Sequence, residues 1–222
     1  MTRFLSISFC ALALATTALA GAVQAQTPAP AASAPMPKPF LVNGTVVGID
    51  GLALTVKDAD GKPVTVALSP DTLLIKVRTI SLDEIKPGSF VATANSADGG
   101  VSSELRVFAP PLNGLGEGSY PMQDGQNMTN GTVKTVVTSV KGREMDVGYS
   151  PKCTTNPDDP HCKSGVRHIT VPASMVIHEW SKIEAADLKP GVGVSVRGRV
   201  SGAAAPMIRA VFIGENGAPP AM

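Results

Sequence analysis

The stretch Cys153–Cys162, CTTNPDDPHC, gathers the densest set of chemically capable side chains in the sequence. It contains two cysteines with eight residues between them, a histidine at its end and two aspartates. A disulfide would close it into a loop, whereas a metal ion held by Cys153, Cys162, His161 and His168 is the alternative. Zinc accepts such ligands, although the cysteines of structural zinc sites usually lie two to four residues apart.

The amino-terminal residues decide in which compartment these cysteines are placed. Residues 1–25 carry a single charge, Arg3, followed by a long run rich in alanine and leucine that ends in small residues. This pattern predicts a secretory signal peptide that is cleaved after Ala25, with Ala20 as a second cleavage site and an uncleaved membrane anchor as the alternative. The alanine-rich run is typical of bacterial export, so we expect a periplasmic protein.

Removal of the signal peptide also removes Cys10, which leaves Cys153 and Cys162 as the two cysteines of the mature chain. Two cysteines in an oxidising compartment favour one disulfide. Closing so short a loop would contribute about 2–3 kcal/mol, and we expect most of it to order the loop locally. A metal site and a redox-active pair remain alternatives, but the spacing differs from the Cys-x-x-Cys of oxidoreductases.

A second set of candidate ligands follows in SMVIHEW, with Met175, His178 and Trp180. In a strand, Met175 and His178 would point to opposite faces, whereas His178 and Trp180 would share one. Together with His161 and His168, these residues form the alternative metal set, for copper or zinc. The competing expectation is that no cofactor binds, that Met175 lies in the core and that His178 and Trp180 form a half-packed pair.

The elements that must position these residues are repeated along the chain. The motif NGTV at Asn43 recurs at Asn130, 87 residues later, and ISLDEIKPG at Ile80 resembles IEAADLKPG at Ile183, 103 residues later. We therefore expect a first domain at residues 40–110 and a second at 128–215. A Pro/Ala-rich linker (26–39), a Gly/Pro-rich linker (111–127) and a tail (216–222) complete the chain.

The offset rises from 87 at Asn43 and Asn130 to 102 at Pro70 and Pro172, which places an insertion of about 15 residues in the second copy, and Cys153–Cys162 lies within it. The first copy has only the short hairpin tip DADGK at this position, around Asp60 and Gly61. The stretch is therefore predicted to extend a hairpin loop in the second copy alone.

Each copy is rich in strands, with one helical turn whose Ser81 and Glu84 have the spacing of a capping box. Five or six strands with one such turn predict an all-β fold of two tandem, small, OB-like Greek-key β-barrels. An open sandwich is the alternative, because the alternation in TVKTVVTSV fits a half-buried strand in either architecture.

The ordered motifs GTV, apolar hairpin and IKPG or LKPG resemble the bacterial exported OB-like domains of unknown function. More loosely, they are similar to the periplasmic copper chaperones of the Cus type, which use histidine, methionines and a tryptophan on the barrel wall. The positions of those ligands are not reproduced here, since the hairpin strands offer only Met145 and His168. The resemblance implies a fold, and a shared fold does not carry a function with it.

Charge and composition exclude some classes of partner. The mature chain would have 18 basic and 18 acidic residues, and aromatic residues are 4% of the sequence, which argues against nucleic-acid binding. We expect a non-catalytic binding or accessory module, not integral to the membrane, whose partner is an envelope protein or a small ligand. The alternative is a periplasmic metal-binding or transport-accessory protein.

Overall fold

The computed structural model describes residues 36–96, 100–122, 125–139, 142–153 and 159–220. These residues form strands, turns and three single-turn 3-10 helices, which confirms the predicted all-β class. The strands are β1 (Lys38–Asp50), β2 (Ala53–Asp58), β3 (Pro63–Ala67), β4 (Leu73–Ile80), β5 (Phe90–Ser96), β6 (Gly100–Phe108), β7 (Gly118–Pro121), β8 (Gln126–Ser139), β9 (Gly142–Tyr149), β10 (Gly165–Pro172), β11 (Ile177–Lys182), β12 (Gly193–Val200) and β13 (Met207–Gly214). The 3-10 helices are η1 (Leu82–Glu84), η3 (Pro160–Cys162) and η4 (Ala185–Asp187). The predicted signal peptide and the tether as far as residue 35 lie outside the described residues.

Local sequence explains the hairpins. Between β2 and β3, the Asp58 carboxylate accepts hydrogen bonds from the backbone N–H groups of Asp60 (3.0 Å) and Lys62 (2.8 Å). Gly61 has a φ of 81°, a conformation that favours glycine. The hairpin expected around Asp60 and Gly61 therefore forms, and its alternating residues Leu54, Val56 and Val66 are buried.

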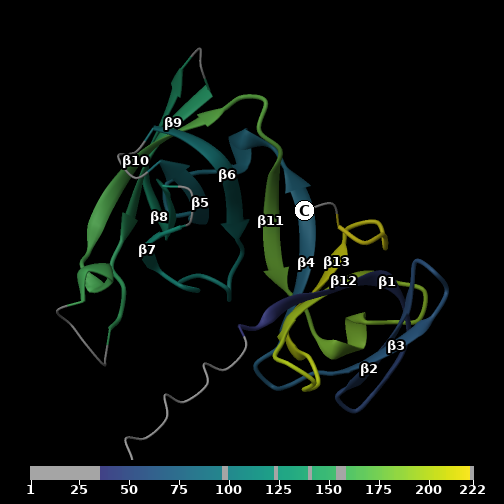
Figure 1. Ribbon diagram of the computed structural model, residues 1–222. Coiled ribbons are helices and arrows are strands. Elements are labelled where there is room, and N and C mark those ends of the chain that lie inside the picture. The colour runs from purple at the N-terminus through teal and green to yellow at the C-terminus, as the bar shows by residue number, and fades with distance from the viewer. Residues whose placement is uncertain (1–35, 97–99, 123–124, 140–141, 154–158, 221–222) are drawn as a thin grey trace, which may run out of the picture. The chain divides into compact units, whose positions relative to one another are not determined.

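The first group of strands, which we call the β1 lobe, combines β1, β2 and β3 with β12 and β13. β1 pairs antiparallel with β12 from Lys38↔Val200 to Thr45↔Gly193, although these strands belong to different sequence repeats. Figure 1 shows the yellow carboxy-terminal strands running beside the purple β1. The buried core of the lobe consists of Val46, Leu54, Val56, Val66 and Leu68 from the first repeat and Leu188, Val194, Val196, Ile208, Val211 and Ile213 from the second.

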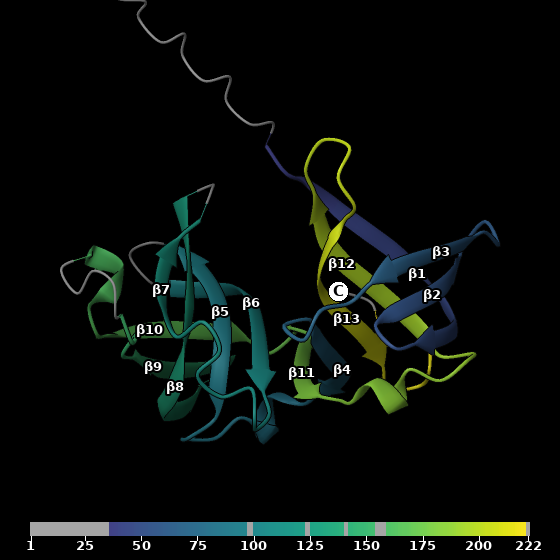
Figure 2. The same cartoon turned by 90° about the horizontal axis from the view of Figure 1, so that it is seen from below.

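The second group, which we call the β8 barrel, combines β8, β9 and β10 with β5 and β6 (Figure 2). Its strands close into a ring, because β8 pairs with β9, β9 with β10, β10 with β6, β6 with β5, and β5 with β8. Its core consists of Ile80, Ile85, Val91, Leu105 and Val107 from the first repeat and Val133, Met145, Val147, Ile169, Val171 and Ile177 from the second.

The strand groups therefore do not follow the expected domain boundaries of 40–110 and 128–215. Each repeat supplies three strands to one group and two strands to the other, so the last two strands of the repeats are exchanged. The region expected as a linker, 111–127, contains β7, which pairs with β8 from Gly118↔Asn130 to Pro121↔Asn127. The expected tail, 216–222, also bonds to the β1 lobe, since the Gly193 N–H on β12 donates to the Gly217 carbonyl oxygen at 2.6 Å.

In each repeat, the chain crosses from one strand group to the other along a single strand, β4 in the first repeat and β11 in the second. These two strands pair antiparallel with each other from Ile177↔Ile80 to Lys182↔Ile75. The pair Trp180↔Val77 lies at the centre of this ribbon. Since the repeat offset here is 103 residues, Val77 and Trp180 are also equivalent positions of the two repeats. The ribbon is thus the place where the repeats meet as pseudo-symmetric partners.

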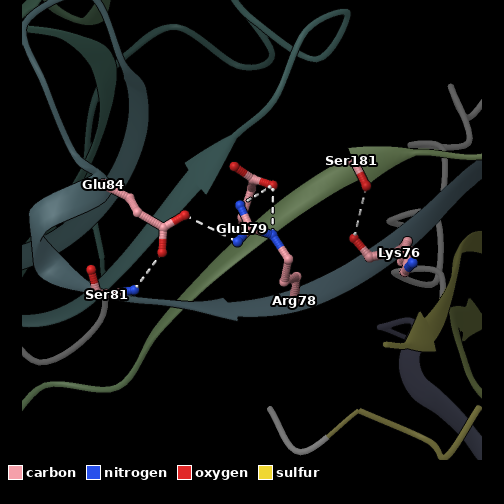
Figure 3. Close-up of polar contacts among 6 residues, drawn as sticks. All are labelled: Lys76, Arg78, Ser81, Glu84, Glu179 and Ser181. Carbon is pink, nitrogen blue, oxygen red and sulfur yellow. Dashed lines mark hydrogen bonds and ion pairs between the residues drawn. The ribbon is translucent and has the colours of Figure 1, made fainter. Parts of the chain in front are cut away.

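One face of the ribbon is polar (Figure 3). Arg78 donates from Nε (3.2 Å) and Nη2 (3.0 Å) to Glu179 Oε1 on the opposite strand, and from Nη1 to Glu84 Oε2 at 3.0 Å. Glu84 also accepts from the Ser81 backbone N–H at 2.9 Å, as the capping-box spacing predicts. This hydrogen bond, followed by the contact with Arg78, lowers the pKa of Glu84. Arg78 on β4 thus connects η1 to β11 through its hydrogen bonds to Glu84 and Glu179.

The opposite face of the ribbon is aromatic. Trp180 lies between Phe108 and Phe212, with ring centroids 5.6 Å and 5.0 Å away. The guanidinium of Arg106 lies over the Trp180 ring at 4.7 Å, and that of Arg197 over the Phe212 ring at 5.5 Å. Such contacts stabilise by about 0.5–1 kcal/mol each at exposed sites and more where the cation is desolvated. Trp180 therefore joins hydrophobic residues from both repeats.

The exchange predicts how the chain behaves when it is cut. If the mature chain is expressed as two fragments divided after Gly114, the fragments should copurify as a one-to-one complex, because each core needs strands from both. Affinity purification through a tag on one fragment, followed by mass determination, measures this. Two fragments that are each folded and monomeric would contradict the exchange.

The aromatic layer predicts a large effect of Trp180. Trp180→Ala should lower the free energy of unfolding by about 3 kcal/mol, since it removes the packing that joins the two repeats. Trp180→Phe should cost much less, because it keeps an aromatic ring and removes an indole N–H that has no hydrogen-bond partner among the described residues. Urea unfolding followed by circular dichroism measures both variants. Equal stability of the alanine variant and the parent would contradict this role.

Candidate functional site

The insertion of the second repeat forms a covalently closed loop between β9 and β10. The predicted disulfide is formed between Cys153 and Cys162, whose Cα atoms lie 5.7 Å apart. At the base of the loop, Ser150 Oγ and Ser164 Oγ are 2.8 Å apart. Residues 154–158, which include one of the two aspartates, lie outside the described residues. The cysteines are thus committed to a cross-link rather than to a metal.

The loop is seated on the segment that leads into β7. The Ser150 N–H donates to Glu117 Oε1 at 2.9 Å, and the Tyr120 hydroxyl donates to the Glu117 carbonyl oxygen at 2.9 Å. The ring of His161, on η3, lies 6.1 Å from the Tyr120 ring. Asp159 fixes the backbone of η3, because its carboxylate accepts from the His161 N–H at 2.8 Å.

Two clefts adjoin the base of the loop and share Glu117. A cleft of about 420 Å³ is lined by residues that include Asn113, Tyr120 and Lys152. A second cleft of about 370 Å³ is lined by residues that include Lys134 and Tyr149. Each cleft thus offers one tyrosine, one lysine and the shared carboxylate, a mixture of apolar surface and hydrogen-bonding groups that suits recognition of a ligand.

Sequence reasoning identified the loop but missed the segment on which it rests. Glu117 and Tyr120 lie in the stretch expected as a linker, whose glycines and prolines obscured the four-residue strand β7. The two tyrosines of the sequence, Tyr120 and Tyr149, were the available signal, since both line the clefts.

The structure separates the residues of the alternative metal set. His168 is exposed on β10, where its Nδ1 lies 2.9 Å from Asp146 Oδ1. This contact, followed by the Thr135 hydroxyl, lowers the pKa of Asp146. Met175 packs against the core of the β8 barrel. No cluster of three or more histidine, cysteine, aspartate or glutamate side chains suited to a metal occurs within the part of the chain that the structure describes.

His178 and Trp180 share a face of β11, as the spacing predicts, but they have different surroundings. Trp180 belongs to the aromatic layer, whereas His178 lines a small pocket of about 200 Å³ beside Val77, Thr79 and the carboxy-terminal segment 214–220. Burial, followed by the positive charge of Arg106, lowers the pKa of His178. The neutral imidazole is therefore the form that the fold accommodates.

Comparisons of the chain with protein-family models, with curated proteins and with solved structures found no match. The OB-like resemblance of the repeats thus stays a prediction. Across the described ranges, no helix has the length and apolar character needed to cross a membrane.

The low pKa of His178 predicts a pH dependence of stability. Because the folded-state pKa lies below the unfolded value of about 6.5, the stabilising contribution of neutral His178 is complete above that value. It is lost as the pH falls toward the lower folded-state pKa. His178→Gln should therefore lose less stability than the parent between about pH 7 and pH 5. Urea midpoints measured across this range, with exposed His161→Gln as control, test this, and parallel curves for all three proteins would contradict it.

Proposed function

We propose that the protein is an exported, non-catalytic binding module that engages an envelope component through the disulfide-closed loop of its second repeat. The observation that carries this proposal is the fixed loop base: a disulfide, the Ser150–Ser164 contact and the Glu117 hydrogen bond hold it beside two clefts. Loops held on a rigid scaffold are favoured places for recognition. The disulfide supports export, since such bonds persist in oxidising compartments.

The structure of the first repeat supports the assignment of partner recognition to the loop of the second. The first repeat has the short β2–β3 turn at the equivalent position, where Asp58 closes a hairpin without an insertion. Two copies of similar strand composition thus differ most at this one place. A difference confined to a hairpin tip leaves the cores unchanged, so we assign it to recognition rather than to stability.

A matched pair of photo-cross-linking positions tests the proposal. A photoreactive amino acid replaces Lys152 in the loop or, as control, Lys62 at the hairpin tip of the first repeat; both side chains are exposed. In cells of the source organism, Lys152 should give cross-linked species that Lys62 does not give. Replacement of Cys153 and Cys162 by serine should weaken these cross-links.

Identical cross-links from both positions, or none from Lys152, would contradict recognition by the loop. Mass spectrometry of the same purified protein also reads the amino terminus, which we expect at Gln26. A chain that keeps residues 1–25 would contradict cleavage of the signal peptide, independently of the cross-linking result.

A further inference from the structure

Two arginines approach each other over the aromatic face of the β4–β11 ribbon. Arg106 lies on β6 and Arg197 on β12, and the strands β11, β4 and β13 lie between these two in the sheet. The Arg106 guanidinium lies over the Trp180 ring, 4.7 Å from its centroid. That of Arg197 lies over the Phe212 ring at 5.5 Å, and the centroids of the two rings are 5.0 Å apart. The aromatic layer thus places two positive charges over neighbouring rings.

The two positive charges are incompletely neutralised. Arg106 forms an ion pair with Glu104, whereas Arg197 pairs with no carboxylate within the ranges that the structure describes. Burial, followed by the positive charge of Arg197, lowers the pKa of Arg106. A guanidinium stays charged at any ordinary pH, so a further negative charge between the two would be stabilised. The Arg106 side chain is 27% exposed and Arg197 is half-buried, so an anion can reach both from solvent.

Several polar atoms on the same sheet face also lack a partner. Four side-chain atoms are buried there without a hydrogen bond among the described residues: Arg197 Nε, Trp180 Nε1, His178 Nδ1 and Ser195 Oγ. Ser195 is the direct cross-strand partner of Phe212, and His178 precedes Trp180 by two residues, so all four belong to one face. Buried polar groups in folded proteins nearly always have a hydrogen-bond partner. The set therefore indicates a layer that a polar ligand would complete.

We propose that Arg106 and Arg197 form the binding site for one phosphate group, either of inorganic phosphate or of a phosphate monoester. A guanidinium donates two parallel hydrogen bonds to an oxyanion. One such fork engages both oxygens of a carboxylate, whereas the oxygens of a phosphate can accept from two forks. The rings of Trp180 and Phe212 hold the guanidinium planes before the anion arrives, which reduces the ordering cost of binding. None of these residues lines the clefts beside the loop, so the site is independent of the function proposed above.

The experiment uses the full mature chain, with inorganic phosphate as the probe. Equilibrium dialysis against radiolabelled phosphate, with the ionic strength kept constant by sodium chloride, should saturate at one phosphate per chain. Because Trp180 is the only tryptophan of the sequence, its fluorescence reports on the ring beneath Arg106. Phosphate should change this fluorescence with the same midpoint as in dialysis, whereas sodium chloride alone should not. Binding without saturation, or without a fluorescence change, would overturn the proposal.

Substitutions with a matched control decide whether the two arginines bind the phosphate. Arg106→Gln and Arg197→Gln should each raise the phosphate dissociation constant at least about tenfold, because each removes charge-assisted hydrogen bonds. Arg209→Gln removes an exposed arginine from β13 and should leave the constant unchanged. Arg197→Lys keeps the charge and the alkyl chain, so it guards against misfolding, and it should still weaken binding because an ammonium lacks the fork. Unchanged affinity in the Arg106 and Arg197 variants, or an equal effect of Arg209→Gln, would refute the site.

Two competitors identify the source of the phosphate group. Phenyl phosphate is a soluble monoester, and phosphatidylcholine vesicles with phosphatidic acid present the same group as a lipid headgroup; vesicles without phosphatidic acid are the control. Displacement of labelled phosphate by phenyl phosphate alone would support a soluble ligand, and displacement by the phosphatidic acid vesicles as well would support a headgroup. Loss of cross-linking from Lys152 with intact phosphate binding would contradict the proposed function and leave the phosphate site standing, so the two failures are distinguishable.

Discussion

The antiparallel pairing of β4 with β11 is the interaction on which the rest of the structure depends. Val77 and Trp180 are equivalent positions of the two repeats and also direct partners in this ribbon. Each crossing strand begins at one strand group and ends at the other, with Leu74 packed on the β1 lobe and Ile80 in the β8 barrel. Neither core is complete unless this ribbon forms.

The two faces of the ribbon stabilise the crossing in different ways. The polar face fixes the direction of approach, because Arg78 bonds both to its cross-strand partner Glu179 and to Glu84 of the following turn. The aromatic face supplies hydrophobic contact through Trp180 and two phenylalanines. It has a cost, since the Arg197 Nε and His178 Nδ1 atoms are buried there without hydrogen-bond partners among the described residues.

The loop of the second repeat is built on a different principle. Its base is fixed by a covalent bond and by side-chain contacts to the segment before β7, not by burial in a core. The clefts beside it combine tyrosines, lysines and a carboxylate. Recognition of a partner would therefore use a surface whose support is fixed by these bonds.

The sequence by itself determined the all-β class, the repeats, the position of the insertion and the disulfide. These features depend on local pattern and on cysteine count, which a single chain displays directly. It also predicted that His178 and Trp180 share a face, because alternation is a property of any strand.

Only the tertiary structure decided which repeat completes each core. The exchanged arrangement and a self-closed one use similar strands, turns and types of pairing, so no local pattern distinguishes them. For the same reason, local sequence could not show whether the candidate metal ligands come together. They are near in sequence, yet they lie at different places in the fold with different neighbours: His161, His168, Met175 and His178. Proximity in the fold depends on strand register and on the path of β4 and β11, and these are set by long-range packing around Trp180.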